Sequence, residues 1–211
     1  MRIGVDFDNT IIQYDRVFHA AALDRGLIVP DFPASKSLIR NHLRRTGREE
    51  EWTCLQGWVY GERIREAEPF PGVVEFFTSC RESGAPVFII SHKTKRPYGG
   101  PPYDLHAAAL AWLEQAGFFD IPGPGLPRTR VFLEETKTQK IERISLTGCT
   151  YFIDDLPEFL SEPGFPLGVG RLLFDPDGRF RGAAEYPRRE DWRGLINFFY
   201  QEWSAHAPTR P

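Results

Sequence analysis

Cysteine is scarce in this 211-residue sequence, which contains only Cys54, Cys80 and Cys149. Their number is odd, and no two of them have the CxxC spacing. A disulfide framework needs paired cysteines and a thiolate zinc site needs closely spaced ones, so the sequence argues against both. We expect the thiols to be reduced.

Long hydrophobic runs are also missing. No apolar run approaches the roughly 18 residues of a membrane-spanning helix. The chain enters an apolar segment at Ile3, which leaves no room before it for a charged region followed by a signal core. These absences predict a cytoplasmic protein that does not bind a membrane.

An excess of positive charge is the third feature that the sequence lacks. Lysine and arginine number 26 against 29 aspartates and glutamates, and the formal net charge is −3. No global positive field is therefore available to hold a nucleic acid polymer. The length suffices for one sizeable core with a small insert, and the oligomeric state stays open.

Short apolar runs that end in a polar residue alternate with helical patterns along the chain. Their length and their β-branched or aromatic content predict buried strands. These strands are Arg2–Asp6, Val87–Ser91, Val131–Leu133, Tyr151–Asp154 and Val169–Phe174. The helices predicted between and after them are Val73–Ser83, Tyr103–Ala116, Gln139–Leu146 and Trp192–Trp203. The alternation predicts an α/β fold in which helices cover both faces of a Rossmann-like parallel β-sheet.

Residues 14–68 interrupt this alternation. Helical patterns cover Asp15–Arg25, Ser35–Arg45 and Glu49–Glu66, and the segment Glu68–Gly72 leads back to the sheet. We therefore expect a small α-helical cap at 14–68, inserted after the first strand of a core that comprises 1–13 and 69–204. Residues 205–211 are expected to form a disordered tail.

Carboxylates follow two of the predicted strands, at the end of the sheet where parallel sheets bind ligands. Asp6 and Asp8 are two residues apart, so they project from the same face of a strand. Asp154 and Asp155 close another strand. If the two strands are neighbours, these carboxylates repel one another unless a cation lies between them, and a few hard oxygen ligands suit Mg²⁺. The pattern predicts a magnesium site.

The same end of the sheet offers groups that can hold a phosphate. A phosphate beside a carboxylate meets a repulsion of about 4 kcal/mol per pair of unit charges at about 4 Å and an effective dielectric of roughly 20. Mg²⁺ and one lysine would offset this repulsion. Lys140, or alternatively Lys137, is the candidate lysine. The Ser91 hydroxyl and backbone N–H groups between Phe7 and Asn9 are further candidate donors.

These motifs, in this order, resemble those of the haloacid dehalogenase-like (HAD) superfamily of aspartate-nucleophile phosphatases. The segment Asp6–Thr10 (DFDNT) resembles the first motif, Ser91 the second, Lys140 the third, and Asp154 with Asp155 the fourth. The resemblance covers roughly residues 1–175. The spacing between Lys140 and Asp154 is similar to that of the 5'-nucleotidase-like branch, and the helical insert resembles a C1-type cap.

The resemblance implies a Mg²⁺-dependent phosphomonoester hydrolase that acts on a small phosphorylated metabolite, such as a nucleotide or a sugar phosphate. Asp6 would form an aspartyl-phosphate, and Asp8 would protonate the leaving oxygen and then activate water. The Asp6 side chain, the Asp8 backbone carbonyl and Asp154 would bind Mg²⁺. Asp155 would help to place the metal or water, or would only cap the helix that follows it.

Three alternatives follow from the same resemblance. A phosphotransferase or phosphomutase would pass the phosphoryl group from the same intermediate to a second hydroxyl. A catalytically silent HAD-like binding protein would be marked by the loss of Asp6, Asp8 or Lys140, all of which are present. True dehalogenases lack the second aspartate of the first motif, because a halide leaves without a proton, so Asp8 favours phosphate esters.

Several residues near these motifs have both a binding and a packing interpretation. His92 is predicted as a substrate contact, within a basic run from 92 to 96 that is either a binding element or a solvated surface. The cap residues that could either bind substrate or serve the cap's own packing and surface are Trp52, Trp58, Tyr60, Arg40, Arg44, Arg45 and Arg48.

Overall fold

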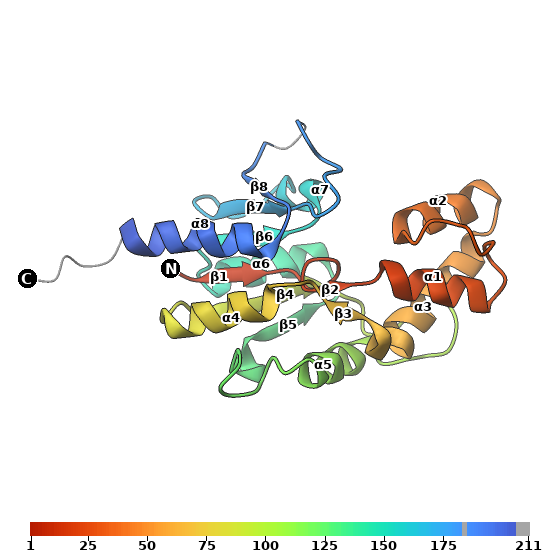
Figure 1. Cartoon of the computed structure of the whole chain (residues 1–211), viewed down its shortest axis with the longest axis horizontal. Helices are drawn as coiled ribbons and strands as arrows, with labels where there is room; N and C mark the ends of the chain where they lie inside the picture. The colour runs from red at the N-terminus through yellow and green to blue at the C-terminus, as the bar shows by residue number, and fades with distance from the viewer. Residues whose placement is uncertain (183–184, 206–211) are drawn as a thin grey trace, which may run out of the picture.

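The computed structural model describes residues 1–182 and 185–205, which form a sheet layered between helices and a group of helices beyond one end of the sheet (Figure 1). Among these residues, six strands form one parallel sheet in the order β5-β4-β1-β6-β7-β8. The strands are β1 (Ile3–Val5), β4 (Val87–His92), β5 (Val131–Glu134), β6 (Tyr151–Asp154), β7 (Gly170–Phe174) and β8 (Arg188–Arg189). The predicted α/β class with a parallel sheet is confirmed.

Strand β1 lies at the centre of this sheet, between β4 and β6. Val5 pairs with Ile89 on one side and with Ile153 on the other. Gly4 is required here, because a Cβ at this position would lie 2.5 Å from the Phe152 ring. Since the three strands run in the same direction, the residues at their carboxyl ends meet at one edge of the sheet.

Helices cover both faces of the sheet, as the pleat of the strands dictates. In β6, Ile153 belongs to the apolar cluster with α4 (Val73–Glu82), α5 (Leu105–Gln115) and α8 (Trp192–Ala205). Its neighbour Phe152 belongs to a second cluster with α6 (Lys137–Leu146) and α7 (Pro157–Leu160). Because neighbouring residues of a strand point to opposite faces, the two clusters lie on opposite sides of the sheet.

The insert after β1 contains α1 (Asp15–Asp24), α2 (Lys36–Arg45), α3 (Glu49–Gly61) and the 3₁₀ turn η1 (Arg63–Glu66). It has its own apolar centre, where the Trp52 ring stacks on Phe18 at a centroid distance of 5.2 Å. At its base, β2 (Ile12–Gln13) pairs antiparallel with β3 (Glu68–Pro69). Figure 1 shows the insert beyond the carboxyl ends of the sheet strands.

Local capping shifts several helix boundaries from their predicted positions. The helix predicted at Gln139–Leu146 begins at Lys137, because Thr136 and Gln139 form a capping box. The helix predicted at Tyr103–Ala116 begins at Leu105, because Asp104 is its N-cap and the Asp104 side chain accepts a hydrogen bond from the N–H of Ala107. A further short 3₁₀ turn, η2, covers Arg128–Arg130.

Two predictions about the ends of helices were wrong. The single helix predicted at Glu49–Glu66 is interrupted after Gly61, where the backbone lies so close to Tyr103 that a Cβ would be 2.3 Å from its ring. The predicted tail starts inside a helix, since Ala205 is the last residue of α8. The rest of that tail, 206–211, lies outside the described residues, as does the side chain of Trp203. In the described part of the chain, no helix is long and apolar enough to cross a membrane.

Candidate active site

Four polar side chains from separate elements meet at the carboxyl end of the central strands. Asp6 follows β1, Ser91 lies near the end of β4, Asp154 ends β6, and Lys140 comes from α6. The Lys140 ammonium lies 2.6 Å from Asp6 Oδ1 and 2.6 Å from Asp154 Oδ2, and the Ser91 hydroxyl donates to Asp6 Oδ1 at 3.0 Å. All four side chains are buried. The structure therefore brings these predicted site residues together.

Lys140 keeps its charge in this buried position. Burial opposes the charge, but the carboxylates of Asp154 and Asp6 outweigh it and raise the pKa of Lys140 above its ordinary value. The ammonium also lies over the Phe159 ring, 3.9 Å from its centroid. A fixed positive charge thus lies directly against Asp6.

Three carboxylates form a group with the composition of a magnesium site. Oxygen atoms of Asp6, Asp154 and Asp155 all lie within 4.8 Å of one another. Burial and the neighbouring Asp6 charge raise the pKa of Asp154 to about 7, although Lys140 works in the other direction. Burial and the charges of Asp154 and Asp6 likewise raise the pKa of Asp155 well above its ordinary value.

This crowding of oxygens is costly unless a cation shares it. Mg²⁺ takes a small number of oxygen ligands and keeps several waters, and the group offers oxygen ligands alone. The residues present therefore fit the ion. Asp8 contributes no carboxylate to this group, and its expected role through the backbone carbonyl stays a prediction.

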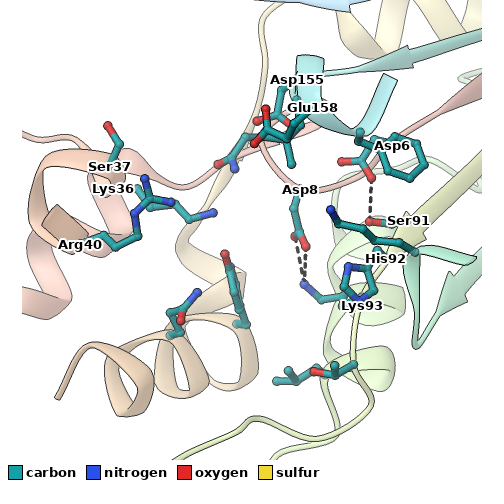
Figure 2. A pocket seen from close by; sticks show the side chains of 18 of the residues that line it. Asp6, Asp8, Lys36, Ser37, Arg40, Ser91, His92, Lys93, Asp155 and Glu158 are labelled. Atoms are coloured by element: carbon teal, nitrogen blue, oxygen red, sulfur yellow. Dashed lines mark hydrogen bonds and ion pairs between the residues drawn. The ribbon is translucent and has the colours of Figure 1, made fainter. Parts of the chain in front are cut away.

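The Asp8 carboxylate is held on the other side of the site. The Lys93 ammonium donates to both of its oxygens at 2.9 and 3.0 Å, and the Tyr14 hydroxyl donates to Oδ1 at 2.8 Å. Burial works against ionisation, but Lys93 and then Lys36 outweigh it and lower the pKa of Asp8. Figure 2 shows Asp8 and Lys93 joined in this way, beside the Asp6–Ser91 pair.

Lys93 is a site residue that the sequence motifs did not point to, as are Tyr14 and Lys36. It belongs to the basic run for which a solvated surface was one interpretation, yet only 4% of the residue is exposed. A signal was available: Lys93 lies two residues beyond Ser91, so a continued strand would project both from one face. Asp6 and Asp8 have this same spacing.

The turn after Asp6 differs in one respect from the prediction. Asn9 has a left-handed backbone, with φ of 58°, which asparagine tolerates better than most residues. Its N–H donates to the Ile12 carbonyl at 2.9 Å. The expected backbone donor at Asn9 is therefore already used, although Asn9 lines the cavity described next. Phe7 points into the packing, with its ring edge against Trp112.

A cavity of about 540 Å³ lies over the site, between the sheet and the insert. Asp6, Asp8 and Asp155 line it from the sheet side, whereas Lys36 and Arg40 line it from helix α2 of the insert (Figure 2). A volume of this size is typical of sites for small organic ligands.

The remaining sequence candidates take different positions around the cavity. Lys137 is exposed and pairs with Glu162 at 2.5 Å, so that Lys140, the preferred candidate, is the lysine in contact with Asp6. His92 lines the cavity, and one of its ring nitrogens lies 3.2 Å from the Glu135 carbonyl oxygen. Its contact with a substrate stays a prediction.

For the aromatic residues and arginines of the insert, the sequence left open whether they bind substrate. The structure shows which of them line the cavity. Trp52 is buried inside the insert, and Trp58 lies beside the guanidinium groups of Arg25 and Arg63. Tyr60, by contrast, lines the cavity. Among the arginines, Arg40 lines the cavity, whereas the others lie outside it: Arg44 pairs with Glu49, Arg48 pairs with Glu51, and Arg45 is exposed.

Comparison with known proteins gives a match in structure alone. No protein-family model and no curated protein matches this sequence. A haloacid dehalogenase-like family hydrolase from Xanthomonas campestris is 14% identical with a TM-score of 0.57, and the alignment covers 100% of this chain and 98% of that one. The chain has the HAD-like fold.

Two further HAD-like structures match over similar lengths. A protein from Lactobacillus delbrueckii subsp. bulgaricus, assigned as a phosphoglycolate phosphatase, is 14% identical with a TM-score of 0.57, over 93% of this chain and 97% of that one. The HAD hydrolase YfnB of Bacillus subtilis, solved bound to magnesium, is 12% identical with a TM-score of 0.52, over 93% and 97%.

The matched structures do not share one reaction, since they also include an L-2-haloacid dehalogenase. At these identities the likeness concerns the fold, and fold does not determine chemistry. The 5'-nucleotidase-like branch and the C1-type cap stay predictions. The reaction has to be argued from the site itself.

Proposed function

We propose that this protein is a Mg²⁺-dependent phosphatase that hydrolyses a small phosphorylated metabolite through an aspartyl-phosphate. One observation carries the proposal: the Asp6 carboxylate is in contact with Lys140 and Ser91 and lies in the oxygen group of Asp154 and Asp155. Mg²⁺ bound by Asp6, Asp154 and Asp155 would neutralise charge on the transferring phosphoryl group.

In the first step, an Asp6 oxygen attacks phosphorus as the bond from phosphorus to the ester oxygen breaks. Lys140 and Ser91 hold the phosphoryl oxygens, because an ammonium and a hydroxyl are the donors closest to Asp6. The leaving oxygen takes its proton from Asp8, which lines the same cavity as Asp6. In the second step, Asp8 takes a proton from water as the water oxygen attacks phosphorus and releases Asp6.

Asp8 must carry a proton for the first of these steps. Lys93 lowers the pKa of Asp8, whereas a phosphate dianion in the cavity would raise it and would compete for the Lys93 ammonium. Substrate binding thus favours the protonated carboxyl that acid catalysis needs. A halide leaves without a proton, so the buried contacts of Lys93 and Tyr14 with Asp8 support phosphate ester chemistry over dehalogenation.

Release of free phosphate from an aryl phosphate, measured with Mg²⁺ and with EDTA, tests the proposal. We expect turnover with Mg²⁺ that Asp6→Asn abolishes, because an amide is a far weaker nucleophile than a carboxylate. Asp31→Asn is the matched control, since Asp31 is exposed in the insert and lies outside the cavity.

Turnover that persists in Asp6→Asn would exclude the covalent mechanism. Appearance of the phosphoryl group on an added alcohol, without free phosphate, would identify a phosphotransferase instead. Absence of turnover with every phosphate ester and metal would favour the binding protein.

A further inference from the structure

Helix α2 of the insert brings two positive charges to the cavity that the proposed reaction does not use. Lys36 and Arg40 lie four residues apart, so they project from the same face of the helix. Both line the 540 Å³ cavity. Figure 2 shows them reaching from the insert, with Lys36 directed toward Asp8 on the opposite wall.

These two cations differ from the other lysines and arginines that line the cavity in the described part of the chain. Each of the others forms an ion pair with a carboxylate: Lys140 with Asp6 and Asp154, Lys93 with Asp8, Lys137 with Glu162, and Arg179 with Asp177. In the same part of the chain, no carboxylate lies within 4.0 Å of the charged groups of Lys36 or Arg40. Among the described residues, the Arg40 guanidinium donates only to the side chain of its neighbour Asn41.

The position of Lys36 is unfavourable for the stability of α2. Lys36 is the first residue of the helix, where the helix dipole disfavours a cation, and no acidic residue lies in that turn. Asp15 accepts the backbone N–H of Lys36 at 2.8 Å but is not in contact with its ammonium. Lys36 is partly buried, and its ammonium lies 5.4 to 5.8 Å from the ring centroids of Tyr14, Phe18 and Tyr60. These rings keep the charge at the cavity rather than in open solvent.

We propose that Lys36 and Arg40 bind a second anionic group of the substrate, so that the enzyme acts on phosphomonoesters whose far end carries a phosphate or a carboxylate. The inference rests on the proposed function and names the substrate class of the same site. An ammonium and a guanidinium side by side suit an oxyanion, which arginine can bind through two parallel hydrogen bonds. The cavity is large enough to hold more than the reacting phosphate.

Three substrates of one chain length test this assignment. They are the bisphosphate of a four-carbon diol, the matching phosphorylated hydroxy acid, and the monophosphate of the diol. We expect the wild-type kcat/KM to favour at least one doubly anionic compound over the diol monophosphate by about tenfold or more, since charge-assisted hydrogen bonds are the strong ones. The compound with the larger preference identifies the second anion as phosphate or carboxylate.

Lys36→Gln, Arg40→Gln and the double variant should reduce this preference, and the double variant should bring it close to one. Arg45→Gln is the matched control, because it removes the same charge from the same helix at an exposed position outside the cavity. It should keep the full preference. Equal wild-type efficiency with all three substrates would overturn the proposal, as would equal losses with all three in the double variant.

Binding separates failure of this assignment from failure of the hydrolase proposal. Calorimetric titrations of the bisphosphate and of the diol monophosphate use Asp6→Asn protein with Mg²⁺, which needs no turnover. We expect the bisphosphate to bind at least about tenfold more tightly, and Lys36→Gln with Arg40→Gln to remove the difference. Equal affinity of the two compounds for the Asp6→Asn protein would overturn the second-anion site, whatever the reaction proves to be.

Discussion

The buried carboxylate group makes stability depend on pH in a direction opposite to that of an ordinary surface aspartate. The pKa of Asp154 is raised from 3.8 to about 7. Between these values the folded state holds a proton that the unfolded chain releases, so the free energy of unfolding falls as the pH rises. Each pH unit in this window costs about 1.4 kcal/mol, and the loss is complete above about pH 7.

The pH dependence of the free energy of unfolding should be largest when no metal is bound. In EDTA, the wild type should lose about 3 kcal/mol of unfolding free energy between about pH 5 and pH 8, relative to Asp154→Asn, which has no carboxyl to titrate at that position. Mg²⁺ at about 100 times its Kd adds about 2.7 kcal/mol by mass action. This gain should be larger at pH 8 than at pH 5, because protons compete with the ion for the same oxygens.

Urea unfolding followed by tryptophan fluorescence, at the two pH values and with either EDTA or Mg²⁺, measures these quantities. Asp31→Asn serves as the surface control and should follow the wild type. The reasoning is refuted if the wild type and Asp154→Asn show the same pH dependence in EDTA, or if Mg²⁺ stabilises both proteins equally. Either result would mean that these carboxylates are not crowded in the folded protein.

Two further substitutions test the other side of the site and the insert. Lys93→Met should lower kcat about 10- to 100-fold and move the acidic limb of its pH profile to higher pH, because Lys93 lowers the pKa of Asp8. Lys93→Arg should restore most of the profile, and an unchanged limb in Lys93→Met would contradict the assignment. Trp52→Ala should cost about 3 to 5 kcal/mol of unfolding free energy, because the buried ring packs on Phe18. Trp58→Ala should cost less than half as much, since Trp58 is only partly buried, and equal losses would show that Trp52 is not the centre of the insert.

The convergence of the strand ends could be predicted from the sequence because it follows from strand geometry alone. Short buried runs that alternate with helices force a parallel sheet, and a parallel sheet brings its carboxyl ends to one edge. Asp6, Ser91 and Asp154 each follow or end such a run. The start of α6 was predicted at Gln139 and lies at Lys137, although Thr136 and Gln139 have the spacing of a capping box.

The sequence could not show which side chains of the insert face the cavity. Helical periodicity shows which of Arg40, Arg44, Arg45 and Arg48 share a face, but packing of α2 on α1 and α3 decides which face meets the cavity. Lys93 was missed for a related reason. A basic run after a strand is usually solvated. Lys93 is buried because Asp8, which lies just beyond the neighbouring strand β1, accepts hydrogen bonds from its ammonium.

The distribution of charge explains why the insert, rather than the sheet, would select the substrate. On the sheet side, the four carboxylates of the site face two buried lysines, and one divalent cation would match the remaining negative charge. The sheet side can therefore hold a phosphoryl group in contact with Lys140 but contributes little net attraction for an approaching dianion. In the described part of the chain, neither Lys36 nor Arg40 forms an ion pair within 4.0 Å, although Asp8 and Asp155 act on the Lys36 charge from the opposite wall. The two residues therefore add positive charge on the insert side of the cavity. A substrate with negative charge at both ends would bind to Lys140 at one wall of the cavity and to Lys36 and Arg40 at the other.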